Sequence, residues 1–315
     1  MSPRFYSNYL RTGLLMAALV ALLAIGGRAV GGYQGMLAFG AIGLALNVAM
    51  YWFSDRIALL AHRAQEVSPA EAPTLYAIVE RLTRRAGIPM PRLYVIPSAA
   101  ANAFATGRNP RHAALAVTDG ILQILSEREL EAVLAHELSH VVNRDVLIAT
   151  VAAGVAGLIS IIGHVLQWGL MFGGGSSRSD EDRGGGLAAL AWIIAAPVIA
   201  LLIQLAISRS REHSADASGG VLCGDPDALA DALQTLEQTR TLRPYEFGGP
   251  ATAHLFIVNP LRGGATAALM GLLSTHPPIE ERVRRLREQA RRQAGGGRPT
   301  KNVAQAGWFG LNQNG

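Results

Sequence analysis

The sequence predicts a mainly α-helical membrane protein, with four transmembrane helices and one cytoplasmic α+β domain that contains a small sheet. Half of the 315 residues are hydrophobic and only 16% are charged, whereas a soluble domain usually carries about 25% charged residues. The apolar residues gather in four long stretches, and the arginines gather at the ends of these stretches. What remains of the chain is long enough to form one hydrophobic core.

Four apolar stretches are the candidate membrane segments. Crossing a hydrocarbon core of ~30 Å takes about 20 helical residues, and the last three stretches meet this requirement well. The first stretch is interrupted by Gly26-Gly27-Arg28, so its arginine must reach the membrane interface. The stretches are Thr12–Val30, Met36–Phe53, Val146–Phe172 and Leu187–Ile207.

The first stretch also has an alternative interpretation. Arg4 and Arg11 could form the basic start of a signal peptide, with a cleavage site near Ala24-Ile25-Gly26. Both interpretations leave the soluble part of the chain on the same side of the membrane.

The distribution of arginine predicts the orientation in the membrane. Basic residues near the ends of membrane segments are enriched on the cytoplasmic side. One side collects seven arginines and the other three, which puts both termini in the cytoplasm and the glycine-rich loop 173–186 outside. The seven are Arg4, Arg11, Arg56, Arg63, Arg144, Arg209 and Arg211, and the three are Arg28, Arg178 and Arg183.

The domain organisation follows from these segments. The soluble residues form one cytoplasmic domain that the third and fourth membrane helices split in sequence. Cys223 is the single cysteine, which excludes an internal disulfide and fits a reducing compartment. The predicted parts are a membrane hairpin (1–53), the first half of the soluble domain (54–145), a second membrane hairpin (146–207), the second half of the soluble domain (208–294) and a disordered tail (295–315).

The soluble part contains four predicted helices and a small sheet. The spacing of apolar residues predicts helices, and Ser126 with Glu129 forms a capping box at the start of one of them. Prolines and a turn at 107–110 delimit the strands. The helices are expected over Pro73–Gly87, from Ser126 to Val141, over Pro226–Arg240 and over Ile279–Gln293; the strands are expected at Leu93–Ile96, Asn102–Thr106 and Ala113–Thr118.

The helix that Ser126 caps carries the motif His136-Glu137-Leu138-Ser139-His140. Histidines at positions i and i+4 share one face of a helix, so their imidazoles can converge on one metal ion. Glu137 can reach a water molecule at that metal. This is the H-E-x-x-H pattern of zinc metalloproteases.

A catalytic zinc usually has three protein ligands and one open position. Glu212 is the best candidate for the third ligand, because a membrane hairpin returns the chain from His140 to this position. Asp216, one turn later, could accept a proton from a ligand imidazole and orient it. His213 is a competing ligand, and a solvated charged helix without a metal is the simpler alternative.

Five segments resemble the HtpX-type membrane metalloproteases, whose relatives include the CAAX prenyl proteases. The resemblance covers nearly the whole chain. The segments are NAFATGRNPRHAALAV (102–117), HELSHVVNRD (136–145), SRSREHSAD (208–216), PATAHLFIVNP (250–260) and STHPPIEERVRRL (274–286).

The resemblance implies a zincin-like protease domain with one zinc ion per chain, held by His136, His140 and Glu212. Glu137 matches the general base that activates a zinc-bound water, and Asp216 matches the acidic residue behind a ligand histidine. His276 matches a catalytic histidine near the bound substrate. The segment Asn102, Ala103 and Phe104 matches an edge that binds an extended peptide by strand addition.

The implied function is quality control in the bacterial inner membrane as part of a stress response. The substrates would be damaged or unfolded membrane proteins, with self-cleavage as a further reaction, and the active site would face the cytoplasm. Three alternatives remain: a prenyl-peptide protease, a membrane scaffold with structural zinc, and a zinc transporter that uses His164. No nucleic-acid-binding motif is present, and the arginines of Arg282–Arg292 are interpreted as one face of a solvated helix.

Overall fold

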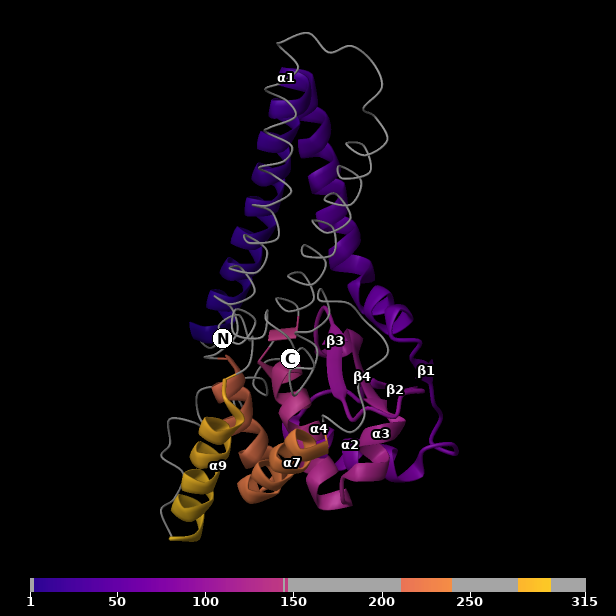
Figure 1. Cartoon of the computed structure of the whole chain (residues 1–315), viewed down its shortest axis with the longest axis vertical. Coiled ribbons are helices and arrows are strands. Elements are labelled where there is room, and N and C mark those ends of the chain that lie inside the picture. Colours follow the sequence, from indigo (N-terminus) through magenta and orange to yellow (C-terminus); the bar gives the residue numbers. More distant parts are fainter. Residues whose placement is uncertain (1–2, 144, 147–210, 240–276, 296–315) are drawn as a thin grey trace, which may run out of the picture.

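A long helical hairpin rises from a domain in which helices cover a small sheet (Figure 1). This computed structural model describes residues 3–143, 145–146, 211–239 and 277–295. The third and fourth predicted membrane segments lie outside these residues, apart from Val146. His164, the loops 173–186 and 241–264, His276 and residues 296–315 also lie outside them.

The hairpin is formed by α1 (Pro3–Ala61), whose backbone leaves the helical conformation at Gly31 and Gly32. Gly32 has a φ of 59°, which glycine adopts without steric cost. The chain therefore reverses between the first two predicted membrane segments, Thr12–Val30 and Met36–Phe53. The two arms are joined by a hydrogen bond of 2.9 Å from the Asn47 side chain to the Met16 carbonyl oxygen.

One described helix, Gly31–Phe53, is long and apolar enough to cross a membrane, with a mean hydropathy of 1.7 in its most apolar window. It contains the second predicted segment, Met36–Phe53. Several large apolar side chains lie on its surface, and those of Leu44 and Val48 are more than half exposed. A surface of this kind fits contact with lipid.

The sheet contains β1 (Gln65–Glu66), β2 (Arg92–Ile96), β3 (Ala103–Gly107) and β4 (Ala113–Thr118), in the order β1-β2-β4-β3. The β2–β4 pair is parallel and the other pairs are antiparallel. The predicted strands on either side of the turn at 107–110 therefore pair as a β-hairpin, with a short helix, η1 (Pro110–His112), inside the turn. Among the described strands, β3 lies at an edge.

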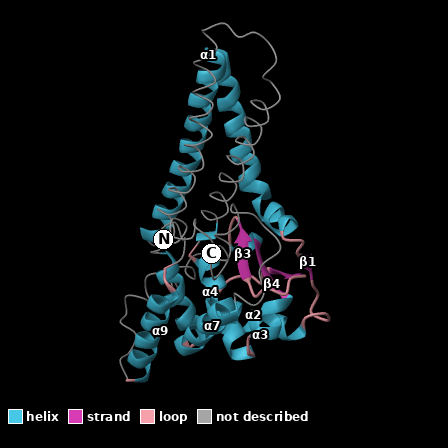
Figure 2. Cartoon of the chain, in the orientation of Figure 1, coloured by secondary structure: helices cyan, strands magenta, loops and turns pink. Residues whose placement is uncertain are grey.

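The soluble helices are α2 (Pro73–Ala86), α3 (Asp119–Ile124), α4 (Glu127–Val142), α7 (Pro226–Thr239) and α9 (Ile279–Ala294). Residues 211–223 are also helical. Figure 2 shows these helices gathered below the hairpin, beside the sheet. The four predicted soluble helices and the capping box at Ser126 are confirmed, whereas the sequence reasoning missed α3 and β1.

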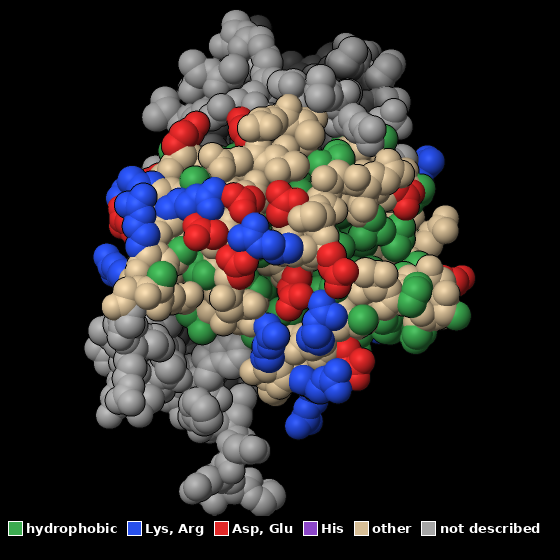
Figure 3. Space-filling view, turned by 90° about the horizontal axis from the view of Figure 1, so that it is seen from below, with side chains coloured by type: hydrophobic (Ala, Val, Ile, Leu, Met, Phe, Trp, Pro, Cys, Tyr) green, Lys and Arg blue, Asp and Glu red, His purple; other side chains and the backbone are tan. Residues whose placement is uncertain are grey.

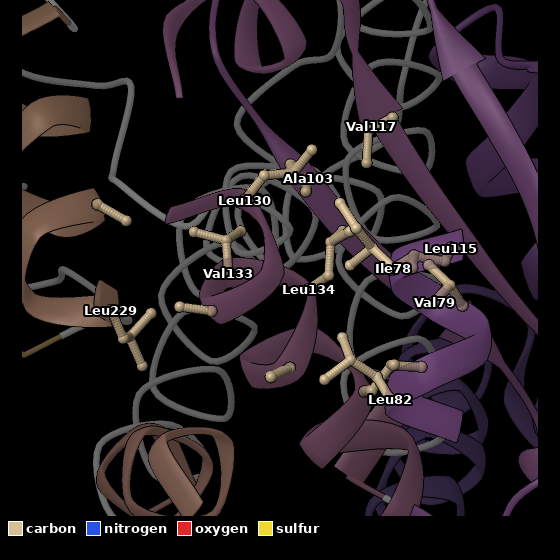
Figure 4. Close-up of a cluster of buried hydrophobic side chains, with 14 of the residues drawn as sticks. Ile78, Val79, Leu82, Ala103, Leu115, Val117, Leu130, Val133, Leu134 and Leu229 are labelled. Atoms are coloured by element: carbon tan, nitrogen blue, oxygen red, sulfur yellow. The ribbon is translucent and has the colours of Figure 1, made fainter. Parts of the chain in front are cut away.

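The hydrophobic core surrounds α4, which lies between the sheet with α2 on one side and α7 on the other (Figure 4). Every residue of α4 from Ala132 to Ser139 is buried. Because burial of a polar group is costly without a partner, the polar side chains in this part of α4 must find partners inside the protein. The core side chains include Ile78, Val79 and Leu82 of α2, Ala103, Leu115 and Val117 of the sheet, Leu130, Val133 and Leu134 of α4, and Leu229 of α7.

The opposite face of the sheet packs on the end of α1, where Leu59 contacts a cluster that includes Phe104. The guanidinium of Arg108, in the turn after β3, lies 4.5 Å from the centre of the Trp52 ring. The hairpin is thereby anchored to the strand that forms the edge of the sheet.

The face of the domain turned away from the hairpin carries interspersed acidic and basic side chains (Figure 3). Arg128 of α4 pairs with Asp225 and Asp231, and Arg287 of α9 pairs with Asp227 and Asp231. These ion pairs connect α4, α7 and α9 around the core.

Candidate metal centre

The buried central turns of α4 carry His136 and His140, one helical turn apart. The ring of His136 is almost fully buried, and the two Nε2 atoms lie 3.3 Å apart. This convergence is the one that the spacing of the motif predicts.

Glu212 comes from the 211–223 helix and lies opposite the two histidines. Its carboxylate oxygens lie 3.7 Å from Nε2 of His136 and 3.6 Å from Nε2 of His140. Among the described residues, these three side chains form a group whose candidate ligand atoms all lie within 4.8 Å of one another.

The spacing of these atoms suits a zinc ion. Tetrahedral zinc with ligands at about 2.0–2.2 Å keeps the ligand atoms roughly 3.3–3.6 Å apart, and the three observed separations are 3.3, 3.6 and 3.7 Å. Two imidazoles and one carboxylate are also a donor set of catalytic zinc sites. His136, His140 and Glu212 would therefore hold the ion and leave one position open.

Asp216 lies behind His136, with Oδ1 3.0 Å from Nδ1 of the ring. Burial lowers the pKa of His136, but Asp216 and Glu212 outweigh this effect and raise it to about 10. With Nδ1 facing Asp216, Nε2 of His136 faces Glu212 and His140.

Arg282 of α9 is the partner of Asp216, and the sequence reasoning missed it. Its Nε and Nη2 donate hydrogen bonds of 2.8 and 2.7 Å to the two oxygens of Asp216. Burial would raise the pKa of Asp216, but the Arg282 charge and hydrogen bonds hold it well below its usual range. The interpretation of Arg282–Arg292 as a solvated face is therefore wrong for Arg282, whose side chain is 0% exposed. The sequence does contain a sign that Arg282 is buried, because it lies four residues before Leu286 and therefore on the same buried face of α9.

His140 has a carboxylate behind it as well. Its Nδ1 lies 3.6 Å from Asp145, a residue that the sequence reasoning did not single out. His213, the alternative ligand, instead faces Glu281 of α9 at 3.7 Å. It does not belong to the group of converging ligand atoms.

Glu137, between the two histidines in sequence, is buried, and Oε2 accepts a hydrogen bond of 3.1 Å from the backbone N–H of Ala105 in β3. Burial is the main effect on this carboxyl group and raises its pKa. A carboxylate with a raised pKa beside a metal-ligand group can act as a general base near neutral pH.

Comparisons with known proteins place this site in a family. The family model described as Peptidase family M48 matches residues 69–290, which include His136, Glu137, His140 and Glu212. The chain belongs to peptidase family M48. It is a metalloprotease, and the resemblance to HtpX-type proteases is confirmed.

The M48 relatives include several proteins named Protease HtpX homolog. One from Syntrophobacter fumaroxidans is 53% identical over 88% of this chain and 98% of its own length. Another from Pyrococcus furiosus is 51% identical over 90% of this chain and 96% of its own length. Among solved structures, S. mikatae Ste24p has a TM-score of 0.48 and 20% identity over 90% of this chain and 66% of that chain.

The edge strand of this M48 domain begins at the predicted substrate segment. Asn102 is buried and its backbone is held by Thr118, whose hydroxyl accepts from Asn102 N–H at 2.9 Å and donates to its carbonyl oxygen at 3.1 Å. Ala103 lies on the α4 side, whereas Phe104 packs on the opposite face against His62 and Leu59. Phe104 thus contributes to the strand through its backbone, and its side chain belongs to the core beside α1.

Proposed function

We propose that this M48 metalloprotease is a zinc-dependent endopeptidase of the inner membrane, with an active site that faces the cytoplasm. Its substrates would be misfolded or damaged membrane proteins. The observation that carries the proposal is the convergence of His136, His140 and Glu212 beside the buried carboxyl group of Glu137.

Zinc is the metal that this donor set favours, because two neutral imidazoles and one carboxylate with one open position match catalytic zinc sites. A bound zinc ion would supply a Lewis acid at the open position. Calcium and magnesium prefer sites made mainly of oxygen ligands, which these residues do not offer.

Glu137 is the proposed general base. Its carboxyl group would take a proton from the attacking water and pass it to the leaving amine of the cleaved peptide bond. The hydrogen bond from Ala105 holds one carboxylate oxygen in place, so the second oxygen is the one that would exchange the proton. His276 is proposed to donate a hydrogen bond to the developing oxyanion, as the resemblance implies.

The edge strand β3 is the proposed docking site for an extended substrate peptide. Its residues alternate in direction, and β4 occupies one side of the strand. The Ala105 N–H points to Glu137 instead of β4, which places the free edge of β3 over α4. A peptide that adds to this edge would lie beside the metal ligands.

The hairpin supports the proposed membrane location. Both ends of α1 lie at the base of the hairpin, on the side of the protease domain (Figure 1), which supports the proposal that the start of α1 and the protease domain share one side of the membrane. An active site close to the membrane surface suits the cytoplasmic loops of membrane proteins.

Purified full-length protein in detergent provides the test of activity. We expect one zinc ion per chain and cleavage of casein that stops with a zinc chelator and returns with added zinc. Bound zinc without cleavage of casein, or of a destabilised membrane protein in the same micelles, would contradict the proposed endopeptidase.

Labelling with a membrane-impermeant maleimide tests the orientation. In a Cys223→Ser background, Ser176→Cys in the loop 173–186 should react in spheroplasts. Glu288→Cys, at a partly exposed position of α9, should react only after lysis. The reverse pattern would place the active site outside the cytoplasm.

A further inference from the structure

We propose that Arg282 is a positioning residue for the metal site and acts on His136 through Asp216. This inference rests on the proposed function, because it assumes that His136 binds zinc. Arg282 would not touch the metal or the substrate. Arg282 would hold the Asp216 carboxylate in place, and this carboxylate would in turn orient the ring of the zinc ligand His136.

Arg282 differs from the other arginines of α9 in its surroundings. Arg284 and Arg285 are about half exposed and pair with glutamates of their own helix. Arg282 is 0% exposed. A buried charge is costly unless it is paired, so the position of Arg282 requires its carboxylate partner.

The geometry of the pair is a two-pronged fork. Nε of Arg282 donates to Oδ2 of Asp216 at 2.8 Å, and Nη2 donates to Oδ1 at 2.7 Å. Two parallel hydrogen bonds hold the plane of the carboxylate as well as its position. Lysine cannot make this contact, because its ammonium group has no planar fork.

The same oxygen that accepts from Nη2 faces the ligand ring. Oδ1 of Asp216 lies 3.0 Å from Nδ1 of His136, while Nε2 of that ring points to His140 and Glu212. Two successive contacts, from Arg282 to Asp216 and from Asp216 to His136, therefore lead from α9 to the ring that carries the metal-binding atom. If the fork is lost, Asp216 can rotate and the ring of His136 loses its fixed orientation.

The proposed role also explains how two halves of the domain are held together at the site. Asp216 and Arg282 lie 66 residues apart in sequence. The 211–223 helix supplies Glu212 and Asp216, and α9 secures that helix at the level of the metal ligands. Arg287, also on α9, pairs with Asp227 and Asp231 of α7. Among the contacts of the described residues, none joins Arg287 to a metal ligand.

The test measures zinc affinity in full-length protein that carries Glu137→Gln, so that neither catalysis nor self-cleavage contributes. Zinc binding is measured by competition with a chromogenic chelator in detergent. Arg282→Met should weaken binding about 10–100-fold, the usual effect of losing a partner behind a ligand histidine. Arg282→Lys should also weaken binding, because it keeps the charge but not the fork. Arg287→Met is the matched control on the same helix and should change affinity less than about threefold, within the context-dependent scatter of a remote contact.

A double-mutant cycle separates this role from a general loss of structure. Asp216→Asn should weaken zinc binding by a similar factor, and adding Arg282→Gln should cause little further loss, because both changes remove one connected unit. The double variant, Asp216→Asn with Arg282→Gln, replaces both charges by amides and leaves no unpaired charge. It can therefore still be measured if Arg282→Met does not fold. The proposal would be overturned if the losses of zinc affinity from the two single changes multiplied in the double variant. It would also be overturned if the Arg282 and Arg287 variants bound zinc with equal affinity.

The outcome is independent of the endopeptidase assay. If the affinity pattern holds and the wild-type protein cleaves nothing, the positioning role stands and the proposed function fails. If the wild type cleaves protein and the pattern is absent, the positioning role alone fails.

Discussion

Gly219 lies against the backbone of His136, so close that an added β-carbon would stand 2.9 Å from both the N and Cα atoms of that residue. The 211–223 helix and α4 therefore touch backbone to backbone at the metal ligands. This approach brings Glu212, two turns earlier on the same helix, within reach of the imidazoles.

Replacing Gly219 by alanine is expected to separate the two helices. In an ordinary helix interior this substitution stabilises by about 1 kcal/mol through helix propensity. At Gly219 the methyl group would meet backbone atoms that cannot move aside, and overpacking typically costs about 1–3 kcal/mol. We expect Gly219→Ala to lower the free energy of unfolding and to weaken zinc binding, as measured by thermal denaturation and chelator competition.

Gly220→Ala is the matched control. Its β-carbon would meet side-chain atoms of Pro226 and Gln289 at 3.1–3.2 Å, and these can shift by a few tenths of an ångström. We expect stability and zinc affinity close to those of the wild type. Equal effects of the two substitutions would show that the close approach at His136 has no special role.

Glu137→Gln should abolish cleavage while the protein still binds zinc. The amide keeps the size of the side chain and can still accept the hydrogen bond from Ala105, but it cannot take a proton from water. General-base catalysis contributes about 10²–10⁴-fold, so kcat should fall by at least about 100-fold. Zinc content and the rate of casein cleavage are measured on the same samples. Cleavage at the wild-type rate would exclude Glu137 as the base.

Zinc binding should strengthen with pH over an unusual range. His136 in the metal-free protein has a pKa of about 10: burial lowers it, and Asp216 and Glu212 raise it by a larger amount. Zinc must displace this proton, so its apparent affinity should rise about tenfold per pH unit from pH 7 to 9. A histidine with its ordinary pKa near 6.5 would give an almost constant affinity over this range.

The same shift has a consequence for the stability of the metal-free fold. A raised pKa stabilises the folded state fully below the unfolded value near 6.5, and this contribution is lost as the pH rises through about 10. The melting temperature of the metal-free protein should therefore fall between pH 7 and 10 relative to that of the zinc-loaded protein. Parallel melting profiles of the two forms would contradict the shift.

Thr118→Val should loosen the start of the edge strand. The Thr118 hydroxyl joins Asn102 at two atoms and also accepts from the N–H of Ile121 at the start of α3. Valine keeps the volume but leaves buried donors without this partner, at a cost of about 1–3 kcal/mol. We expect a lower melting temperature and a lower kcat/KM with peptide substrates.

Thr106→Val provides the control for this change. The Thr106 hydroxyl is buried in β3 and has no hydrogen-bond partner among the described residues. The same substitution should therefore leave stability unchanged or raise it slightly. If Thr106→Val destabilises the protein as much as Thr118→Val does, the bonds to Asn102 are not the cause.

Much of the local structure could be predicted from the sequence because each signal lies within a few neighbouring residues. The capping box of Ser126 and Glu129 marks the start of α4. Gly87, whose backbone is left-handed, marks the end of α2. The prediction of hairpin strands around residues 107–110 also depended on local turn chemistry. The break in α1 at Gly31 and Gly32 falls between the first two predicted segments, Thr12–Val30 and Met36–Phe53. Gly27 serves a different purpose, because a side chain there would collide with the carbonyl oxygen of Gly35 in the other arm.

Helical periodicity alone places His136 and His140 on one face with Glu137 beside them, so the motif indicates a metal site without knowledge of the fold. The distant residues that complete the site follow only from the packing of the folded chain. The burial of Arg282 beside Asp216 and the hydrogen bond from Ala105 to Glu137 join elements that are far apart along the chain. The spacing of residues within one helix follows from its backbone geometry, whereas contacts between elements depend on how whole surfaces pack, which no local pattern encodes.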